Sequence, residues 1–165
     1  MTEIPCARSL ARAGAWHEAA ASVALNYEGR LLRRKRLQTD AGWAFLVDLP
    51  MASGLNHGDA LLLDDGRAVA IKAAPEPVLV VRGALPRLAW HIGNRHTPCQ
   101  IGPDQLVIRA DHVLEAMLRQ LGAEVHEAIA TFTPEGGAYG HGRTMGHDHG
   151  HDHGQEHGHH RHGRE

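Results

Sequence analysis

The last 25 residues, from His141 to Glu165, confine any packed core to roughly the first 140 positions of this chain. The segment holds nine of the fifteen histidines, interleaved with glycine and aspartate, and it has no apolar residue after Met145. A segment with so little apolar content cannot bury enough surface to offset the entropy lost on folding. We therefore expect a disordered His-rich tail joined to a folded part that is large enough for one domain or two small ones.

The composition of the tail also predicts metal binding. Imidazole is the commonest protein ligand for ions such as Ni²⁺, Zn²⁺ and Cu²⁺, and glycine leaves the backbone free to wrap an ion. A purification tag is the alternative, but a tag is usually an uninterrupted run of one residue. We interpret the segment as a native metal-binding tail, with candidate ligands His141, His147, His149, His151, His153, His157, His159, His160 and His162.

Several functional classes are disfavoured by composition. The net charge of −2, with histidines neutral, gives no general attraction for nucleic acid. Cys6 and Cys99 are the only cysteines, which argues against a disulfide framework or a thiolate-rich zinc site. No signal peptide and no apolar stretch long enough to span a membrane is visible, so we expect a cytoplasmic protein. Phosphate-loop, dinucleotide, nucleophile-elbow and HExxH motifs are missing, and we expect no enzyme and no catalytic or cofactor-binding residues.

Short strands separated by turns are predicted up to about residue 74. The clearest hairpin joins residues 59–63 to 67–72, because Asp65-Gly66 supplies the positive φ that tight hairpins need. Residues 1–20 are weakly patterned, and Pro50 is expected to end a strand. Further strands are predicted over residues 22–27, 29–38 and 43–49. The chain is thus expected to be α+β, with a small all-β domain over residues 1–74.

A stiff linker is predicted at Pro75-Glu76-Pro77, because proline fixes φ and restricts the preceding residue. The following residues predict a strand (78–82), a helix (85–92), a hairpin (99–101 with 105–109), a helix (112–121) and a strand (123–132). Asp111 is a good N-cap for the second helix, and Gly122 a good C-cap. This β-α-β-β-α-β order is typical of a ferredoxin-like domain, here over residues 75–140, with the tail over 141–165.

The stretch WHIGNRHTPC contains the best candidate site outside the tail. His96 follows a helix end and is expected to be exposed, but one imidazole cannot satisfy a metal that takes four to six ligands. In a twofold dimer, a residue near the axis meets its own copy, so each protomer supplies half of the ligands. An ordinary solvated surface histidine is the alternative.

Other residues have weaker claims to a site. His112 either decorates the first turn of its helix or is a peripheral ligand. Cys99 is either a small buried apolar residue or, less often, a thiolate ligand. The basic residues Arg30, Arg33, Arg34, Lys35 and Arg36 form either a solvated strand face or a docking patch for an acidic protein. RNA binding is disfavoured because no aromatic residue interleaves with these charges. We expect His17, His57 and His126 to lie on the surface.

Four motifs together resemble one known family. They are LNHGDALLLDDGRAVAIKA at 55–73, GNRHTP at 93–98, DHVLEAMLRQLG at 111–122, and FTPEGGAYGHG at 132–142 before the tail. In this order they are similar to the urease accessory nickel metallochaperones, and the resemblance extends from about residue 22 to the tail.

The resemblance implies a peptide-binding-like N-terminal β-domain and a ferredoxin-like C-terminal domain that forms a homodimer. It implies that His96 meets its symmetry mate and shares a Ni²⁺ ion, that His141 and later histidines add ligands, and that His91 is an auxiliary ligand. Some members have a second histidine two positions before His112, where this chain has Ala110. The implied recipients are a urease accessory GTPase and the urease apoprotein. A general buffer or store for Zn²⁺, Cu²⁺ or Ni²⁺ is the alternative function, since the composition of the tail does not select nickel.

Overall fold

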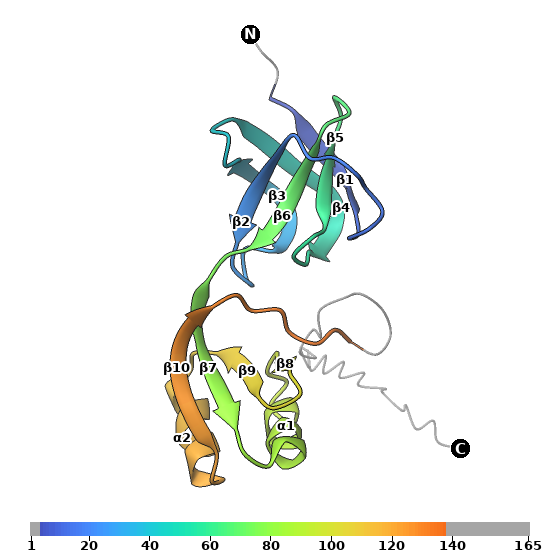
Figure 1. Cartoon of the computed structure of the whole chain (residues 1–165). Helices are drawn as coiled ribbons and strands as arrows, with labels where there is room; N and C mark the ends of the chain where they lie inside the picture. Colours follow the sequence, from blue (N-terminus) through green and yellow to red (C-terminus); the bar gives the residue numbers. More distant parts are fainter. Residues whose placement is uncertain (1–3, 138–165) are drawn as a thin grey trace, which may run out of the picture.

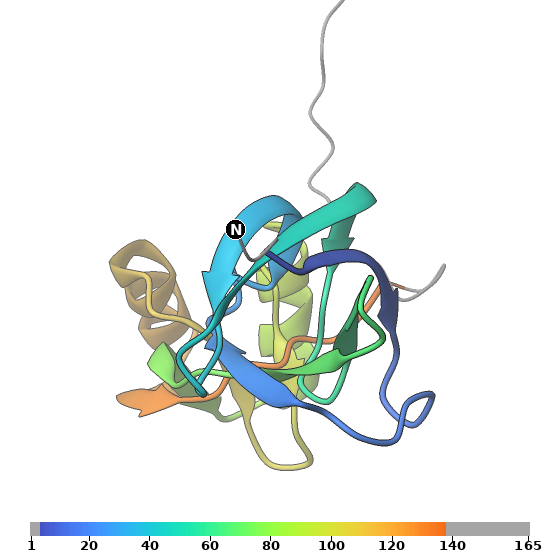
Figure 2. The ribbon, with the colours of Figure 1, turned by 90° about the horizontal axis from the view of Figure 1, so that it is seen from above.

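The computed structural model describes residues 4–137, which form two β-sheets that follow each other along the chain (Figure 1). The N-terminal sheet has six strands in the spatial order β2-β6-β5-β1-β4-β3, and it curls around its own core (Figure 2). Its strands are β1 (Cys6–Ala11), β2 (Ala21–Leu25), β3 (Leu31–Gln38), β4 (Ala44–Gly54), β5 (Ala60–Leu63) and β6 (Ala68–Ala73). Residues 4–73 thus supply an all-β unit, as the sequence predicted.

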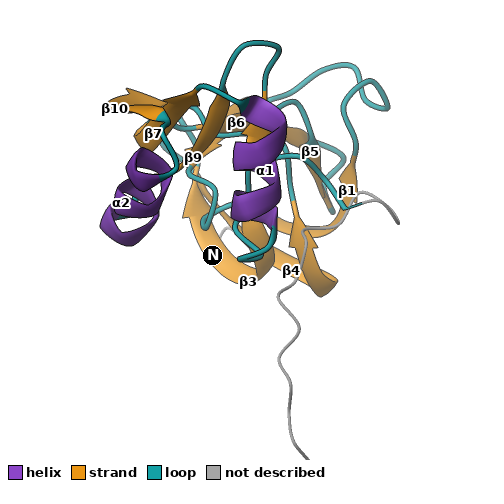
Figure 3. Cartoon of the chain, turned by 90° about the horizontal axis from the view of Figure 1, so that it is seen from below, coloured by secondary structure: helices purple, strands orange, loops and turns teal. Residues whose placement is uncertain are grey.

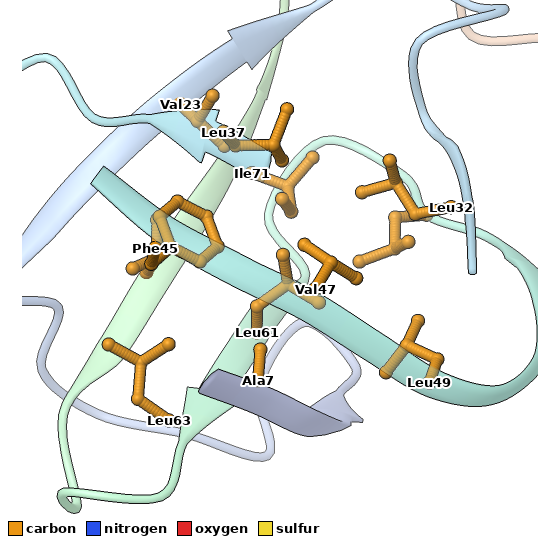
Figure 4. Close-up of a cluster of buried hydrophobic side chains, with 12 residues drawn as sticks. Ala7, Val23, Leu32, Leu37, Phe45, Val47, Leu49, Leu61, Leu63 and Ile71 are labelled. Atoms are coloured by element: carbon orange, nitrogen blue, oxygen red, sulfur yellow. The ribbon is translucent and has the colours of Figure 1, made fainter. Parts of the chain in front are cut away.

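Buried and exposed side chains alternate along the strands of this unit, and the buried ones form its core. On β4, Phe45, Val47 and Leu49 are buried, while Leu46 between them is 39% exposed. Successive side chains of a strand point to opposite faces, so one face of the curled sheet is apolar. The interior cluster comprises Ala7, Val23, Leu32, Leu37, Phe45, Val47, Leu49, Leu55, Leu61, Leu63, Val69 and Ile71 (Figure 4).

The C-terminal unit follows the predicted order of elements. It consists of β7 (Glu76–Arg82), α1 (Leu85–Gly93), β8 (Gln100–Ile101), β9 (Leu106–Arg109), α2 (His112–Gln120) and β10 (Glu124–Ala130). Its sheet has the spatial order β10-β7-β9-β8, and every pairing in it is antiparallel. Figure 3 shows the two helices together on one side of this sheet.

The two faces of the C-terminal sheet bury different surfaces. Leu79 and Val81 of β7 pack in the cluster that includes Leu88 and Ile92 of α1 and Leu118 of α2. Alternate residues on the same strands face the other way. Val78 and Val107 pack with Tyr27 and Phe132 in a separate cluster that lies between the two units. The second face of the sheet therefore supports the junction with the N-terminal unit.

Helix α2 begins and ends close to the predicted positions. The carboxylate of Asp111 accepts hydrogen bonds from the backbone N–H groups of Val113 and Leu114, which stabilises the first turn. Gly122, at φ +86°, donates its N–H to the carbonyl of Arg119 and ends the helix in the left-handed conformation that glycine adopts without strain.

Two expectations about the strands were wrong. The weakly patterned N-terminus contains β1, which pairs in parallel with β4 at only two positions and antiparallel with β5. Pro50 does not end its strand, because β4 continues to Gly54. The ladder between β3 and β4 passes from Leu32↔Ser53 to Arg34↔Asp48, so Pro50 lies in the irregular part where no ladder hydrogen bond is required of it.

The linker is also shorter than predicted. Glu76 and Pro77 already belong to β7, where they pair with Ala130 and Ile129 of β10. Proline is tolerated at the start of a strand, so only Ala74 and Pro75 separate the two sheets. Among residues 4–137, no helix is long and apolar enough to cross a membrane.

Candidate metal-binding site

His96 lies on the turn between α1 and β8 and is exposed, as the sequence predicted. Asn94 caps α1, and the N–H of His96 donates to the carbonyl of Gly93 at 2.9 Å. His96 has φ +54° and is the single non-glycine residue with a positive φ in the described part of the chain. The turn therefore reverses the chain so tightly that His96 must adopt the left-handed conformation.

That conformation is unfavourable for a histidine. A residue with a Cβ pays on the order of 1 kcal/mol to occupy the left-handed region, whereas glycine does not. Gly93 is three positions away and has no positive φ, so the chain places an imidazole where glycine would fit better. Strained backbone that carries a reactive side chain is characteristic of functional sites.

A cavity of about 350 Å³ adjoins His96. Its lining comes from the turn (His96, Thr97, Pro98), from the end of β9 and the residue after it (Arg109, Ala110), and from the start of α2 (Asp111, Leu114). The turn after α1 and the N-terminus of α2 are thus neighbours in space, although Asp111 lies 15 positions after His96 in the sequence.

The structure does not bring all of the predicted histidines to this cavity. His91 is half-buried in the last turn of α1, with its ring edge-on to Trp90 at 5.1 Å between centroids. His112 is exposed at the first residue of α2, but it is not among the residues that line the cavity. Within residues 4–137, no group of three or more His, Cys, Asp or Glu side chains is placed to hold a metal.

The remaining histidines of the folded part are on the surface, as expected. His17, His57 and His126 are all exposed. His126 on β10 has its Nε2 atom 2.6 Å from Oε1 of Glu124, on the face of the sheet away from the helices. The tail histidines from His141 to His162 lie outside the described residues.

Cys99 packs as an apolar side chain against the core beneath the helices. Burial, and secondly the carboxylate of Glu135, raises the pKa of the Cys99 thiol to about 11. The protonated thiol is a poor metal ligand, since the thiolate is the species that binds. The structure thus favours the apolar role over ligation.

This raised pKa predicts slow alkylation of Cys99. A shift from 9.0 to about 11 lowers the thiolate fraction near pH 8 about 100-fold, and we expect iodoacetamide to react more slowly with Cys99 than with a free cysteine by roughly that factor. Peptide mass mapping over time measures the rate, and the same protein in 8 M urea is the control. A native rate equal to the rate in urea would contradict the buried thiol.

Residues 131–137, which follow β10, run beside Cys99 and Gln100, a few residues after His96. Figure 1 shows this segment crossing from β10 toward β8 below the N-terminal unit. The N–H of Thr133 donates to Oε1 of Gln100 at 2.9 Å, and the N–H of Glu135 donates to the carbonyl of Cys99 at 2.8 Å. Two hydrogen bonds therefore fix residues 131–137, which we call the root of the tail, to Cys99 and Gln100 at the start of β8.

Arg30 anchors the same segment to the N-terminal unit, and sequence reasoning missed it. The expectation that Arg30 belongs to a solvated basic run was wrong, because its side chain is buried, with 1% exposed. Its guanidinium donates to three backbone carbonyls: Leu25 (3.0 Å), Leu55 (3.2 Å) and Phe132. The predicted strand over residues 29–38 began too early, because Arg30 lies in the turn that precedes β3, and the polar pair Glu28-Gly29 was the available signal for that turn.

Aromatic and charged groups complete this junction. The rings of Tyr27 and Phe132 meet edge to face at 5.4 Å between centroids. The N–H of Tyr27 donates to Oε2 of buried Glu76 at 2.8 Å, and Arg109 pairs with Glu28 at 2.9 Å. Groups from both units therefore hold the root of the tail in place.

Comparison with known proteins assigns the chain to a family. Residues 2–74 match the model for the UreE urease accessory protein, N-terminal domain, and residues 76–162 match the model for the C-terminal domain. The chain belongs to the UreE urease accessory protein family, as the motifs at 55–73, 93–98, 111–122 and 132–142 indicated. The family name gives it a role in urease maturation.

Three relatives, each named urease accessory protein UreE, illustrate the similarity. The protein of Rhodobacter capsulatus is 61% identical over 137 residues, which is 83% of this chain and 88% of the relative. That of Paracoccus denitrificans is 66% identical over 124 residues, covering 75% and 80%. That of Ruegeria pomeroyi is 55% identical over 148 residues, covering 89% and 99%.

Proposed function

We propose that this chain is a nickel metallochaperone, which binds Ni²⁺ and delivers it for assembly of the urease active site. In this proposal it is a homodimer joined through the C-terminal unit, which we assign to the ferredoxin-like class on its β-α-β-β-α-β order and its sheet order. His96 of each protomer contributes to one shared ion, and His141 and later tail histidines add ligands. The recipients are a urease accessory GTPase and the urease apoprotein.

The observation that carries this proposal is the exposed, strained turn at His96. An imidazole that is held outward by a left-handed backbone can meet its own copy across a twofold axis. Each protomer then supplies half of a ligand set that neither could complete with one imidazole.

The fixed position of residues 131–137 supports the proposal that His141 and later tail histidines add ligands to the ion at His96. Glu135 is hydrogen-bonded to Cys99, three residues from His96. The six residues from Glu135 to His141 can extend by at most about 20 Å, and those from His96 to Cys99 by about 10 Å. His141 therefore starts within reach of the His96 turn of its own protomer.

Exposed imidazoles suit delivery better than permanent storage. Nitrogen ligands exchange Ni²⁺ more readily than a closed thiolate cage, and protons compete with the metal for the same nitrogens. His91 and His112 remain candidate auxiliary ligands in this scheme, and Zn²⁺ and Cu²⁺ are expected competitors.

Proton competition predicts a steep fall in metal affinity between pH 7 and pH 5. Only neutral imidazole binds metal, and histidine side chains in general titrate between these two pH values, so we expect the nickel affinity to fall by at least about 100-fold. Calorimetric nickel titration of the full chain in a series of non-coordinating buffers measures this. An affinity that stays flat over the interval would exclude imidazole as the principal ligand.

The experiment that tests the function is deletion of the gene in a urease-producing host. We expect urease activity to be lost and to be restored by excess nickel in the medium. If urease is unaffected and the host instead becomes sensitive to Zn²⁺ or Cu²⁺, the chain is a metal buffer and the proposal fails.

A further inference from the structure

The root of the tail crosses the width of the C-terminal sheet. It leaves β10 after Ala130 at one edge and reaches Cys99 and Gln100 at the start of β8, the strand at the opposite edge (Figure 1). Neighbouring strands are about 4.8 Å apart, so crossing from β10 to β8 moves the chain by roughly 15 Å. The tail therefore leaves the folded part beside the strand that follows His96, and not beside β10.

Two side chains of the N-terminal unit hold this crossing against the sheet. The guanidinium of Arg30 donates a hydrogen bond to the carbonyl of Phe132. The ring of Tyr27 meets the ring of Phe132 edge to face, and both rings pack with Val78 and Val107 of the sheet. Phe132 is fully buried. The root is thus covered on one side by the N-terminal unit and on the other by the C-terminal sheet.

The hydrogen bond from Arg30 to Phe132 is fixed in direction by the N-terminal unit. The same guanidinium donates to the carbonyls of Leu25 and Leu55, and because it is planar, these two bonds set the direction of its third donor. Without Arg30, the buried carbonyl of Phe132 loses this donor. A buried acceptor that loses its donor is costly, and movement of the root toward water would replace it. The position of the root therefore depends on Arg30.

That position decides how close to His96 the tail histidines begin. Six residues lead from Glu135 to His141, but eleven lead from Ala130 to His141. The probability that a flexible chain closes falls with about the 3/2 power of its length, which gives a loss of about 2.5-fold for this lengthening. A start at β10 instead of β8 lowers it further. Release of the root should therefore lower the effective concentration of His141 at His96 about threefold to tenfold.

We propose that Arg30 is a positioning residue for nickel binding, because it holds the root of the tail across the sheet and so brings the tail histidines to the ion at His96. This inference rests on the proposed metal function and deepens it. It gives the N-terminal unit a part in nickel affinity, although none of the residues of that unit is assigned as a ligand.

Calorimetric nickel titration of four full-length chains tests this role. They are the wild type and Arg30→Met, each with the tail intact and each with all nine tail histidines replaced by alanine. We expect Arg30→Met to weaken the tightest site about threefold to tenfold when the tail is intact, and to change it by less than about twofold when the tail histidines are absent. Equal losses in both backgrounds would show that Arg30 acts on the fold and not through the tail, and would overturn the proposal. An unchanged affinity with the tail intact would also overturn it.

The matched control for stability is Leu61→Ala. It removes a buried side chain from the core of the N-terminal unit, in a different cluster from Phe132. We expect nickel affinity within about twofold of the wild type, and a loss as large as that of Arg30→Met would assign the effect to stability and overturn the proposal. If circular dichroism shows that Arg30→Met does not fold, Arg30→Lys takes its place. A lysine cannot serve three carbonyls, so it should show a smaller loss of affinity that again requires the tail histidines.

Amide hydrogen exchange of the metal-free protein separates position from metal binding. The N–H groups of Thr133 and Glu135 are hydrogen-bonded beside β8, and we expect Arg30→Met to speed their exchange at least about tenfold. Leu61→Ala should leave both within about threefold, because the root opens locally. Unchanged exchange in Arg30→Met would overturn the positioning role even if the wild type binds nickel as proposed. A wild type without a tight site that requires His96 would overturn the proposed function and the nickel role of Arg30 with it, while the exchange rates would still show whether Arg30 holds the root.

Discussion

Substituting His96 by alanine should abolish the tightest nickel site and leave the weaker tail sites in place. In the proposed dimer both copies of His96 bind the same ion, so the substitution would remove two ligands from each dimer, one from each protomer. Removal of a group that only hydrogen-bonds to a metal ligand typically lowers metal affinity about 10- to 100-fold. Removal of the ligands themselves should therefore lower the affinity at least about 100-fold. Calorimetric titration, with mass measurement in solution, gives affinity and stoichiometry per dimer.

Two controls separate the site from the fold and from the tail. His96→Gly removes the same imidazole but relieves the left-handed strain, so it should bind as poorly as His96→Ala and be more stable than it, by on the order of 1 kcal/mol. A chain that stops after Tyr139 should keep the His96 pair and lose the weak sites. If His96→Ala retained the tightest site, the assignment of His96 would be refuted.

Substituting Arg30 by methionine should be the most damaging single change for stability. It leaves three buried carbonyls, those of Leu25, Leu55 and Phe132, without their donor. An unsatisfied buried acceptor costs about 1–3 kcal/mol. Because the surroundings can partly relax and give some of the three carbonyls other donors, we expect a total loss of stability of about 3–5 kcal/mol. Urea unfolding followed by circular dichroism measures the change.

The matched control is Arg33→Met, which removes the same side chain from an exposed position on β3 and should change stability by less than about 0.5 kcal/mol. Arg30→Lys retains a charge but not the planar fork, and it should lie between the two. If Arg30→Met lost less than about 1 kcal/mol, the contacts at the junction would be weaker than their geometry indicates.

Local signals in the sequence predicted local structure well. The Asp65-Gly66 turn, the Asp111 cap and the Gly122 stop each depend on residues within a few positions, and each lies where the pattern placed it. β1 was missed for the opposite reason. It is stabilised by β4 and β5, which lie more than 30 residues away, and its own six residues alternate poorly.

The candidate site was only partly predictable for the same reason. The exposure of His96 follows from the helix end before it and was predicted correctly on that ground. The left-handed conformation of His96 and its approach to Asp111 depend on tertiary packing of two separate turns. Arg30 and Phe132 are 102 residues apart, and no pattern in either segment indicates that one binds the other. The metal ligands in the tail stay a prediction.

The hydrogen bond between the Tyr27 amide and the Glu76 carboxylate has a practical consequence for dissecting the molecule. The most obvious cut, between the two sheets at Ala74, would place the donor on one fragment and its buried acceptor on the other. Each fragment would then expose to solvent a surface that is buried in the intact chain. Aggregation or unfolding of either fragment would therefore say little about the role of that unit in the intact protein.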